Sequence, residues 1–386
     1  MYIKKFSVQN YRSLENVSVS GLSPQVILFG DNDTGKSNVL AFLELLFQRK
    51  YIIDMTVTSS DDNRESKRPS DFWLGYIDDF SDNFCYANDD PISFSVTICF
   101  NDDELNYLPA EVKSTKHKDQ TEHVLKISGQ IARTEFHDRA EIILQNVEFD
   151  LKLIFDGSKQ DIEKYLPEFG LSQTEMIQVF EQLMSPLNDS FLRIPADRFI
   201  KKEGENNNKD QEISLSAETF KNWLFSINLD RDKETIYQDV VKQFNSQPFQ
   251  KGRLSIARVK ENNLEIFVED QLGHKLPIGS KGTGVQQILI ILAYLAQSKA
   301  FFVGIEEIEV NLSPQTQKSI FDTIINLVQL PQARVSQMFF ITHSQIIASR
   351  RVHEIEIEKR QVTITDGKTS IEKPTDQNLT DFFNPL

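Results

Sequence analysis

The sequence predicts an α/β fold with a mixed central sheet, an antiparallel β subdomain and an inserted helical lobe. An apolar strand at Gln25 to Phe29 runs straight into a glycine loop, and apolar residues at helical spacing follow from Val39 to Phe47. Residues 91–155 alternate apolar and polar side chains, which is typical of antiparallel strands with one buried face. Two further apolar strands, Phe301 to Ile305 and Met338 to Thr342, flank a helical segment.

These elements divide the chain into three predicted parts, which are an N-terminal lobe over 1–155, a helical lobe over 156–250 and a C-terminal lobe over 251–386. Helical spacing marks 158–188 and 216–243, and the segments LSIARV and LEIFVE predict a β-hairpin. The polar stretches 53–90 and 201–212 are interpreted as loops.

Composition limits the classes of function. The 386 residues are 39% hydrophobic and 26% charged, which is typical of a folded globular protein. No apolar run approaches the roughly 20 residues that span a bilayer, and the two cysteines lack metal-ligand spacing, so we expect a cytoplasmic protein without a membrane partner. The net charge of −15 argues against broad affinity for nucleic acids, although a local basic groove stays possible.

The glycine loop is the strongest chemical signal. Its sequence GDNDTGKS, from Gly30 to Ser37, fits G-x-x-x-x-G-K-[ST] between a predicted strand and a predicted helix. In such a loop, backbone N–H groups and the helix N-terminus surround phosphate oxygens, a lysine neutralises them and a hydroxyl ligates Mg²⁺. Lys36 and Ser37 are predicted in these two roles, which favours a nucleoside triphosphate with Mg²⁺ over a turn without a ligand.

Polar residues also follow the two later strands. Glu306 and Glu307 end the first of them, where one acid can hold the Mg²⁺ shell and the other can activate water. His343 ends the second strand and is suited to sensing a γ-phosphate by a hydrogen bond. Alone, two acids after a strand are commonly solvated loop residues and a lone histidine there is more often structural, so the interpretation depends on the phosphate loop upstream.

A second glycine loop, GSKGTG from Gly279 to Gly284, precedes the apolar helix Ile288 to Leu295. A helix N-terminus of this kind can bind phosphate. Taken alone, the loop fits an ordinary capped helix start after a hairpin better, and phosphate binding stays open as the second interpretation.

Together the motifs resemble the ABC-type ATPases that include RecF, the SMC proteins and the overcoming-lysogenization-defect proteins, and most closely the compact AAA-type group. IKKFSVQNYRSL and GDNDTGKS are similar to the opening of that group, GSKGTGVQQILIIL to its signature loop and helix, IEEIEVNLSP to its Walker B segment and D-loop, and FFITHS to its switch histidine. The resemblance covers residues 1–48 and 275–345.

The resemblance implies ATP and Mg²⁺ as ligands, Ser37 and Glu306 as metal-side residues, and Glu307 and His343 as catalytic residues. Ser280 and Gly282 would contact ATP bound to a second copy, so the family implies a homodimer or a higher homo-oligomer. The IPADR segment, with Asp197 and Arg198, is the candidate for the glutamine-loop region. The implied nucleotide-binding residues of the loop and its flanks are Arg12, Gly30, Asn32, Thr34, Gly35, Lys36, Ser37 and Asn38.

Some residues depart from the family pattern. Glu306 stands where most ABC proteins have Asp, Ile308 and Asn311 replace Pro and His, and Lys281 and Thr283 alter the signature loop, so we expect slow hydrolysis. Only 43 residues follow His343, too few for a nuclease domain.

The resemblance therefore implies a nucleotide-dependent sensor or scaffold for a separate nuclease or toxin in anti-phage defence. The alternatives are DNA repair or clamp action of RecF type and a nucleotide-gated interaction module with little turnover.

Overall fold

The chain forms two compact units in the computed structural model, which describes residues 1–47, 73–78, 90–101, 104, 122–133, 139–150, 152–156, 178–179, 182–196, 198, 220–231, 233–245, 252–260, 263–270, 272–328, 334–352 and 355–375. The first unit takes Met1–Phe191, Ser336–Met338 and Glu356–Leu386, and the second takes Leu192–Val335 and Phe339–Ile355. The first unit therefore combines both ends of the chain.

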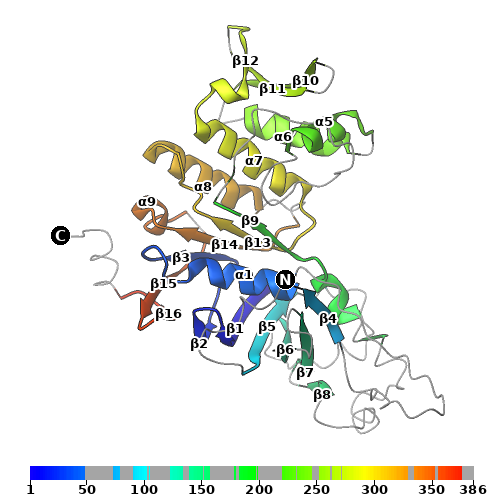
Figure 1. The fold of residues 1–386 in the computed structure, drawn as a ribbon, viewed down its shortest axis with the longest axis vertical. Helices are drawn as coiled ribbons and strands as arrows, with labels where there is room; N and C mark the ends of the chain where they lie inside the picture. The colour runs from blue at the N-terminus through cyan, green and yellow to red at the C-terminus, as the bar shows by residue number, and fades with distance from the viewer. Residues whose placement is uncertain are drawn as a thin grey trace. The chain divides into compact units, whose positions relative to one another are not determined.

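The first unit contains an antiparallel sheet (Figure 1). Its neighbours run in the order β2 (Leu14–Ser20), β1 (Tyr2–Tyr11), β5 (Ile92–Phe100), β6 (His123–Arg133), β7 (Arg139–Phe149) and β4 (Trp73–Asp78), and β8 (Lys152–Asp156) pairs with β7. The predicted antiparallel β subdomain is confirmed. The strand β4 corrects the prediction of a loop over 53–90, because its sequence WLGYID is rich in residues that favour strands.

Helix α1 (Lys36–Phe47) supplies one side of the core of this unit. The Phe42 ring lies 6.3 Å from that of Phe6, 5.6 Å from that of Tyr11 and 6.5 Å from that of Phe94. These rings come from α1, β1 and β5, so aromatic packing fixes the helix against the sheet.

The first unit also contains a mixed sheet around β3 (Gln25–Phe29), whose five residues are all buried. The strand β15 (Ile357–Thr365) pairs with β3 in parallel, and β16 (Lys368–Glu372) pairs with β15 antiparallel. The strand β14 (Gln337–Thr342) begins in this unit, where the buried Gln337 amide bonds the backbone of Ile3 and Ser23. The predicted mixed sheet is confirmed.

In the second unit, β14 continues beside β13 (Phe302–Glu306), and β13 lies beside β9 (Phe191–Ile194). The helices α7 (Thr283–Gln297), α8 (Pro314–Val328) and α9 (Gln345–Ala348) accompany these strands in the chain. All residues of β13 are buried, as are those of β14, because both are apolar runs bounded by polar residues.

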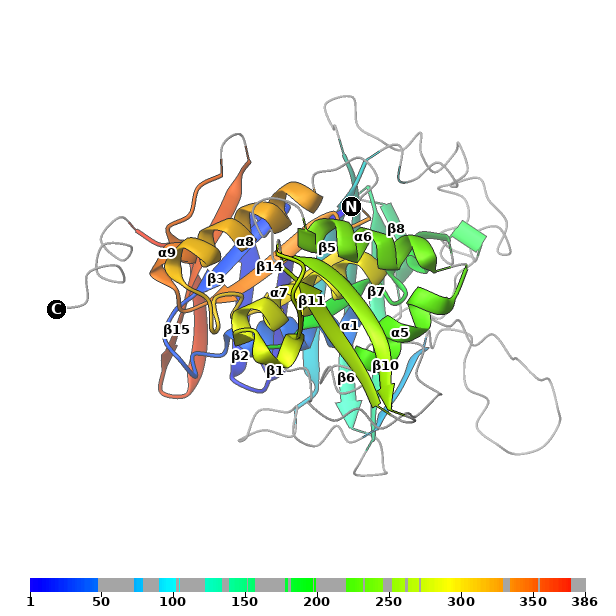
Figure 2. The same cartoon turned by 90° about the horizontal axis from the view of Figure 1, so that it is seen from above.

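The second unit also holds a helix pair and a small sheet, which Figure 2 shows side by side. The stretch predicted as helical over 216–243 is divided into α5 (Phe220–Leu229) and α6 (Glu234–Asn245). The Lys233 N–H donates to the Asp230 carbonyl in a turn between them. The predicted hairpin is formed by β10 (Arg253–Lys260) and β11 (Asn263–Glu269), and the short β12 (Lys275–Pro277) extends it.

Some predictions concern segments that the structure does not describe. The polar loop at 201–212, most of 53–90 and most of the helical segment 158–188 lie outside the described residues, as does Asp197. Among the residues with a described position, no helix is long and apolar enough to cross a membrane. The three-part domain division stays a prediction.

Candidate functional site

The phosphate loop is packed tightly against the hairpin of β15 and β16, which is called the C-terminal hairpin below. A Cβ atom on Gly30 would lie 2.1 Å from the Val362 carbonyl oxygen, and one on Gly35 would lie 2.2 Å from Thr369 Oγ1. Gly35 also has a φ of 93°, which side-chain-bearing residues rarely adopt. Both loop glycines are therefore required by the backbone and its close neighbours within the first unit.

Hydroxyl groups hold the loop in place. The Thr369 hydroxyl donates to the Thr34 carbonyl oxygen at 2.9 Å and lies 2.7 Å from the Ser13 hydroxyl. The Ser13 hydroxyl in turn accepts a bond from Asn38 Nδ2 at 2.8 Å. Sequence reasoning missed Ser13 and Thr369, because single hydroxyl residues 356 positions apart form no local pattern.

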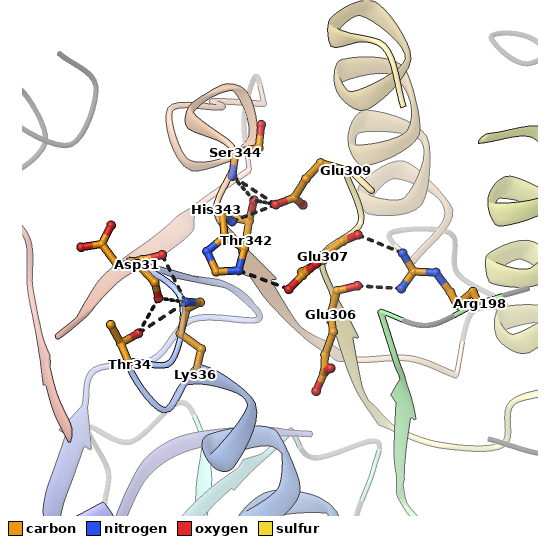
Figure 3. A network of polar contacts seen from close by, with 11 residues as sticks. Asp31, Thr34, Lys36, Arg198, Glu306, Glu307, Glu309, Thr342, His343 and Ser344 are labelled. Carbon is orange, nitrogen blue, oxygen red and sulfur yellow. Dashed lines mark hydrogen bonds and ion pairs between the residues drawn. The ribbon is translucent and has the colours of Figure 1, made fainter. Parts of the chain in front are cut away.

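Lys36 begins α1 and points back into the loop (Figure 3). Its ammonium group donates to the Gly30 carbonyl at 3.1 Å, to the Asp31 carbonyl and to Thr34 Oγ1 at 3.4 Å. The side chains of Asn32 and Ser37 are exposed at the tip of the loop and the start of the helix. The arrangement places a cation and a helix N-terminus in one loop, which is what anionic oxygens require.

Arg12 lies beside the first turn of α1. Its guanidinium bonds Asn38 Oδ1 at 3.4 Å and lies 5.3 Å from the centre of the Tyr11 ring. The structure thus places Arg12 and Asn38 beside the phosphate loop, and their role in nucleotide binding stays a prediction.

In the second unit, β13 ends at the paired acids. Glu306 is buried, with 8% of its surface exposed, and its Oε1 atom accepts bonds from Arg193 Nε at 2.8 Å and Nη2 at 2.6 Å. Arg193 lies on β9, and sequence reasoning missed it because it stands singly in an apolar strand. The charge of Glu306 is therefore balanced inside the unit.

Glu307 lies at the turn that follows. Its backbone has a left-handed φ of 44°, and its N–H donates to the Ile341 carbonyl at 2.8 Å. Its Oε1 atom lies 3.2 Å from Nε2 of His343 (Figure 3). Both side chains are about one-third exposed, so the two predicted catalytic residues share one partly open position.

Glu309 holds the segment that carries His343. One carboxylate oxygen, Oε1, accepts bonds from the Thr342 hydroxyl at 2.7 Å, the His343 N–H at 2.8 Å and the Ser344 N–H at 3.1 Å (Figure 3). Sequence reasoning did not assign Glu309 a role. Its place in IEEIEV, two residues after Glu307, was the available signal.

The second glycine loop ends with Gly282 as the N-cap of α7, without a side-chain cap. Ser280 lies in a 3₁₀ turn (Ile278–Ser280), and its hydroxyl donates to the Pro277 carbonyl at 2.6 Å. A Cβ atom on Gly279 or Gly282 would meet nothing within 4 Å, whereas one on Gly284 would lie 2.7 Å from Leu312 Cδ2. The packing of the chain itself therefore requires Gly284 but not Gly279 or Gly282.

A family model for the AAA ATPase domain matches the chain over residues 1–348. The chain belongs to this family. The expected membership of the AAA-type ATPases is thus confirmed, and the matched region holds the phosphate loop, the paired acids and His343. The hairpin of β15 and β16 follows the matched region.

Three solved structures are similar to this AAA ATPase across nearly all of both chains. An SMC head bound to the C-terminal winged-helix domain of ScpA is 14% identical, covers 99% of this chain and 100% of its own, and has a TM-score of 0.49. The SMC head domain of Thermotoga maritima is 12% identical, with coverages of 97% and 100% and a TM-score of 0.44.

An Smc head with an extended coiled coil, bound to the C-terminal domain of ScpA derived from Pyrococcus furiosus, is 13% identical, with coverages of 99% and 98% and a TM-score of 0.46. No curated protein matches the chain.

The residues of this AAA ATPase that could serve Mg²⁺ are oxygen donors. The exposed Ser37 hydroxyl and the Glu306 carboxylate are the kinds of ligand that Mg²⁺ prefers, together with phosphate oxygens and water. In the described part of the chain, no group of three or more His, Cys, Asp or Glu residues could hold a metal ion. Each of these two groups, Ser37 in the first unit and Glu306 in the second, is by its chemistry a donor that Mg²⁺ accepts.

We predict that Glu309→Ala loosens the segment of His343, because three hydrogen bonds to one carboxylate oxygen are lost and bonds to charged groups contribute about 1.5–3 kcal/mol each. Hydrogen exchange of a peptide covering residues 338–349 should accelerate at least about tenfold. Glu309→Gln is the matched control, since its amide oxygen can still accept. Unchanged exchange in Glu309→Ala would contradict this role.

Proposed function

We propose that the chain binds ATP at the phosphate loop and hydrolyses it slowly. Membership of the AAA ATPase domain family establishes a nucleotide-binding ATPase class. The observation that carries the finer proposal is the buried Lys36 ammonium, which contacts the loop carbonyls of Gly30 and Asp31. Phosphate oxygens offer this cation a better partner than neutral carbonyls, so a triphosphate would draw Lys36 from the loop carbonyls to its β and γ phosphates.

The residues around Lys36 have matching roles. The tight loop between Gly30 and Gly35 supplies backbone N–H groups, and Asn32 and Thr34 border the phosphate position. Arg12, directly after β1, and Asn38, in the first turn of α1, would contact the nucleotide from beside the loop. Ser37 and Glu306 would hold Mg²⁺, which neutralises phosphate charge when it is bound.

Glu307 is proposed as the residue that orients and deprotonates the attacking water. Its carboxylate is partly exposed, and its contact with His343 keeps it at the end of β13. His343 would sense the γ-phosphate by a hydrogen bond and give up its contact with Glu307 on doing so. Because Arg193 engages Glu306, that carboxylate would serve both the arginine and Mg²⁺, which is a reason to propose slow turnover.

The signature loop is proposed to act on a second copy of the chain. Ser280 and Gly282 are exposed, and the chain itself leaves the space beside Gly279 and Gly282 open. A phosphate group of a partner's ATP could approach the backbone closely there, which is a common reason for glycine at a helix N-terminus. The functional unit would then be a homodimer with two shared sites.

The first test separates binding from chemistry. Lys36→Ala should abolish binding of a fluorescent ATP analogue, whereas Glu307→Gln should bind it normally and release phosphate at least about 100-fold more slowly than the wild type. Lys318→Ala, at an exposed position of α8, is the control. Wild-type phosphate release by Glu307→Gln would contradict its catalytic role, and no turnover by the wild type would favour the nucleotide-gated module.

The second test concerns Gly282, beside which the chain leaves open space. We predict that Gly282→Ser leaves the melting temperature unchanged or slightly higher, because Ser is a good N-cap and meets nothing in the chain. ATP turnover should nevertheless fall at least about tenfold, since the side chain would occupy the space of the partner's phosphate. Wild-type turnover in this variant would contradict the proposed contact.

In cells, we propose that the ATPase cycle controls a separate nuclease or toxin during phage infection. Its net charge of −15 disfavours the alternative of a RecF-like DNA ATPase. Cells that carry the native locus with Lys36→Ala should lose protection against phage, measured as plating efficiency, while Lys318→Ala should keep it. Equal plating on all strains would contradict this role, and salt-sensitive DNA binding would favour the alternative.

A further inference from the structure

A buried arginine links the first turns of α7 to the end of β13. Arg198 is 1% exposed and follows β9 in the chain. Its Nη1 atom donates to the Glu306 carbonyl and its Nη2 atom to the Glu307 carbonyl at 2.9 Å (Figure 3). Its Nε atom donates to Gln287 Oε1 at 2.6 Å, and Nη1 also donates to the Pro195 carbonyl. One planar guanidinium therefore fixes three backbone positions and one side chain.

Gln287 completes the link from the helix side. It is fully buried on α7, five residues after the N-cap Gly282, and its Nε2 atom donates back to the Arg198 carbonyl at 3.1 Å. Both ends of its amide are thus used by Arg198, so the orientation of Gln287 is determined. Helix α7 also contacts the turn after β13 directly, because Gly284 packs against Asn311 and Leu312.

The positive charge of Arg198 suits this position. Burial lowers its pKa to about 10, while the carboxylates of Glu309, Glu306 and Glu307 oppose that shift. The group remains protonated at neutral pH, and all its described contacts are to oxygen acceptors. A lysine at this position would offer a point charge on a flexible stem instead of a planar fork.

We propose that Arg198 and Gln287 are positioning residues that transmit the placement of the signature helix α7 to the Glu307 carboxylate. Arg198 holds the carbonyl groups on both sides of the Glu307 backbone N–H and Cα, at the point where φ is 44° and the side chain turns towards His343. A shift of α7 displaces Gln287, and through Arg198 it displaces the turn that aims Glu307. This inference rests on the proposed function.

The test compares steady-state turnover with nucleotide affinity. In Arg198→Lys and in Gln287→Leu, kcat should fall about 10- to 100-fold, because small displacements of a catalytic group have effects of that size. The Kd for a fluorescent ATP analogue should stay within about twofold of the wild type, since neither residue touches the phosphate loop in the described contacts. The double variant should be no slower than the slower single variant, because both act through one contact.

A matched control and a second readout guard against general unfolding. Arg350→Lys removes another paired arginine contact of this unit, with Asp322, and should keep wild-type kcat. In Arg198→Lys, hydrogen exchange of a peptide covering 302–312 should accelerate, while a peptide covering 36–47 should exchange as in the wild type. Acceleration in both peptides would show loss of the fold and overturn the positioning role.

The outcomes also separate this inference from the proposed function. If Lys36→Ala and Glu307→Gln behave as expected while Arg198→Lys and Gln287→Leu turn over ATP like the wild type, only the positioning role is overturned. If Glu307→Gln is as active as the wild type, the proposed function fails first. In that case faster exchange in the 302–312 peptide of Arg198→Lys would still report the structural link, and unchanged exchange would refute it.

Discussion

The close approach of the C-terminal hairpin to the phosphate loop constrains the first unit. Val362 and Thr369 occupy the space that side chains on Gly30 and Gly35 would need, and the Thr369 hydroxyl bonds the Thr34 carbonyl. The loop therefore keeps its backbone compact and its lysine turned inward. Because β15 pairs in parallel with β3, the end of the chain shapes a motif that lies within its first 40 residues.

In the second unit, three glutamates lie close together in the chain, and their negative charges need partners. Glu306 is balanced by Arg193, Glu309 is bonded by a hydroxyl and two backbone N–H groups, and Glu307 is left partly exposed beside His343. Arg198 adds a buried positive charge beneath the turn. Glu307 therefore keeps a carboxylate that is about one-third exposed, which suits the proposed activation of water.

Features formed by residues that are close together in the chain could be predicted from the sequence. The phosphate loop, the acids after β13 and His343 after β14 were predicted because each is a contiguous motif at the end of an apolar strand. The antiparallel sheet followed from alternation along β5 to β7. The assignment of roles to these residues remains a prediction, although the family match spans them all.

Contacts between distant segments were beyond sequence reasoning. Arg193 contacts Glu306 across 113 positions, Arg198 contacts Gln287 across 89, and Thr369 contacts Ser13 across 356. A single Arg, Gln or Thr forms no sequence pattern from which its distant partner can be predicted. Arg198 was placed by resemblance in a glutamine-loop region, whereas the structure shows its contacts with the backbone of Glu306 and Glu307 and with Gln287.

The central claim is that each ATP site combines the phosphate loop of one copy with the signature loop of another. Mixing Lys36→Ala subunits with Gly282→Asp subunits tests it most directly, because each variant alone lacks one half of every site. Random pairing of equal amounts should restore about a quarter of wild-type ATP turnover, since half the dimers are mixed and each mixed dimer has one intact site. No restoration, with mixed dimers shown to form, would contradict the claim.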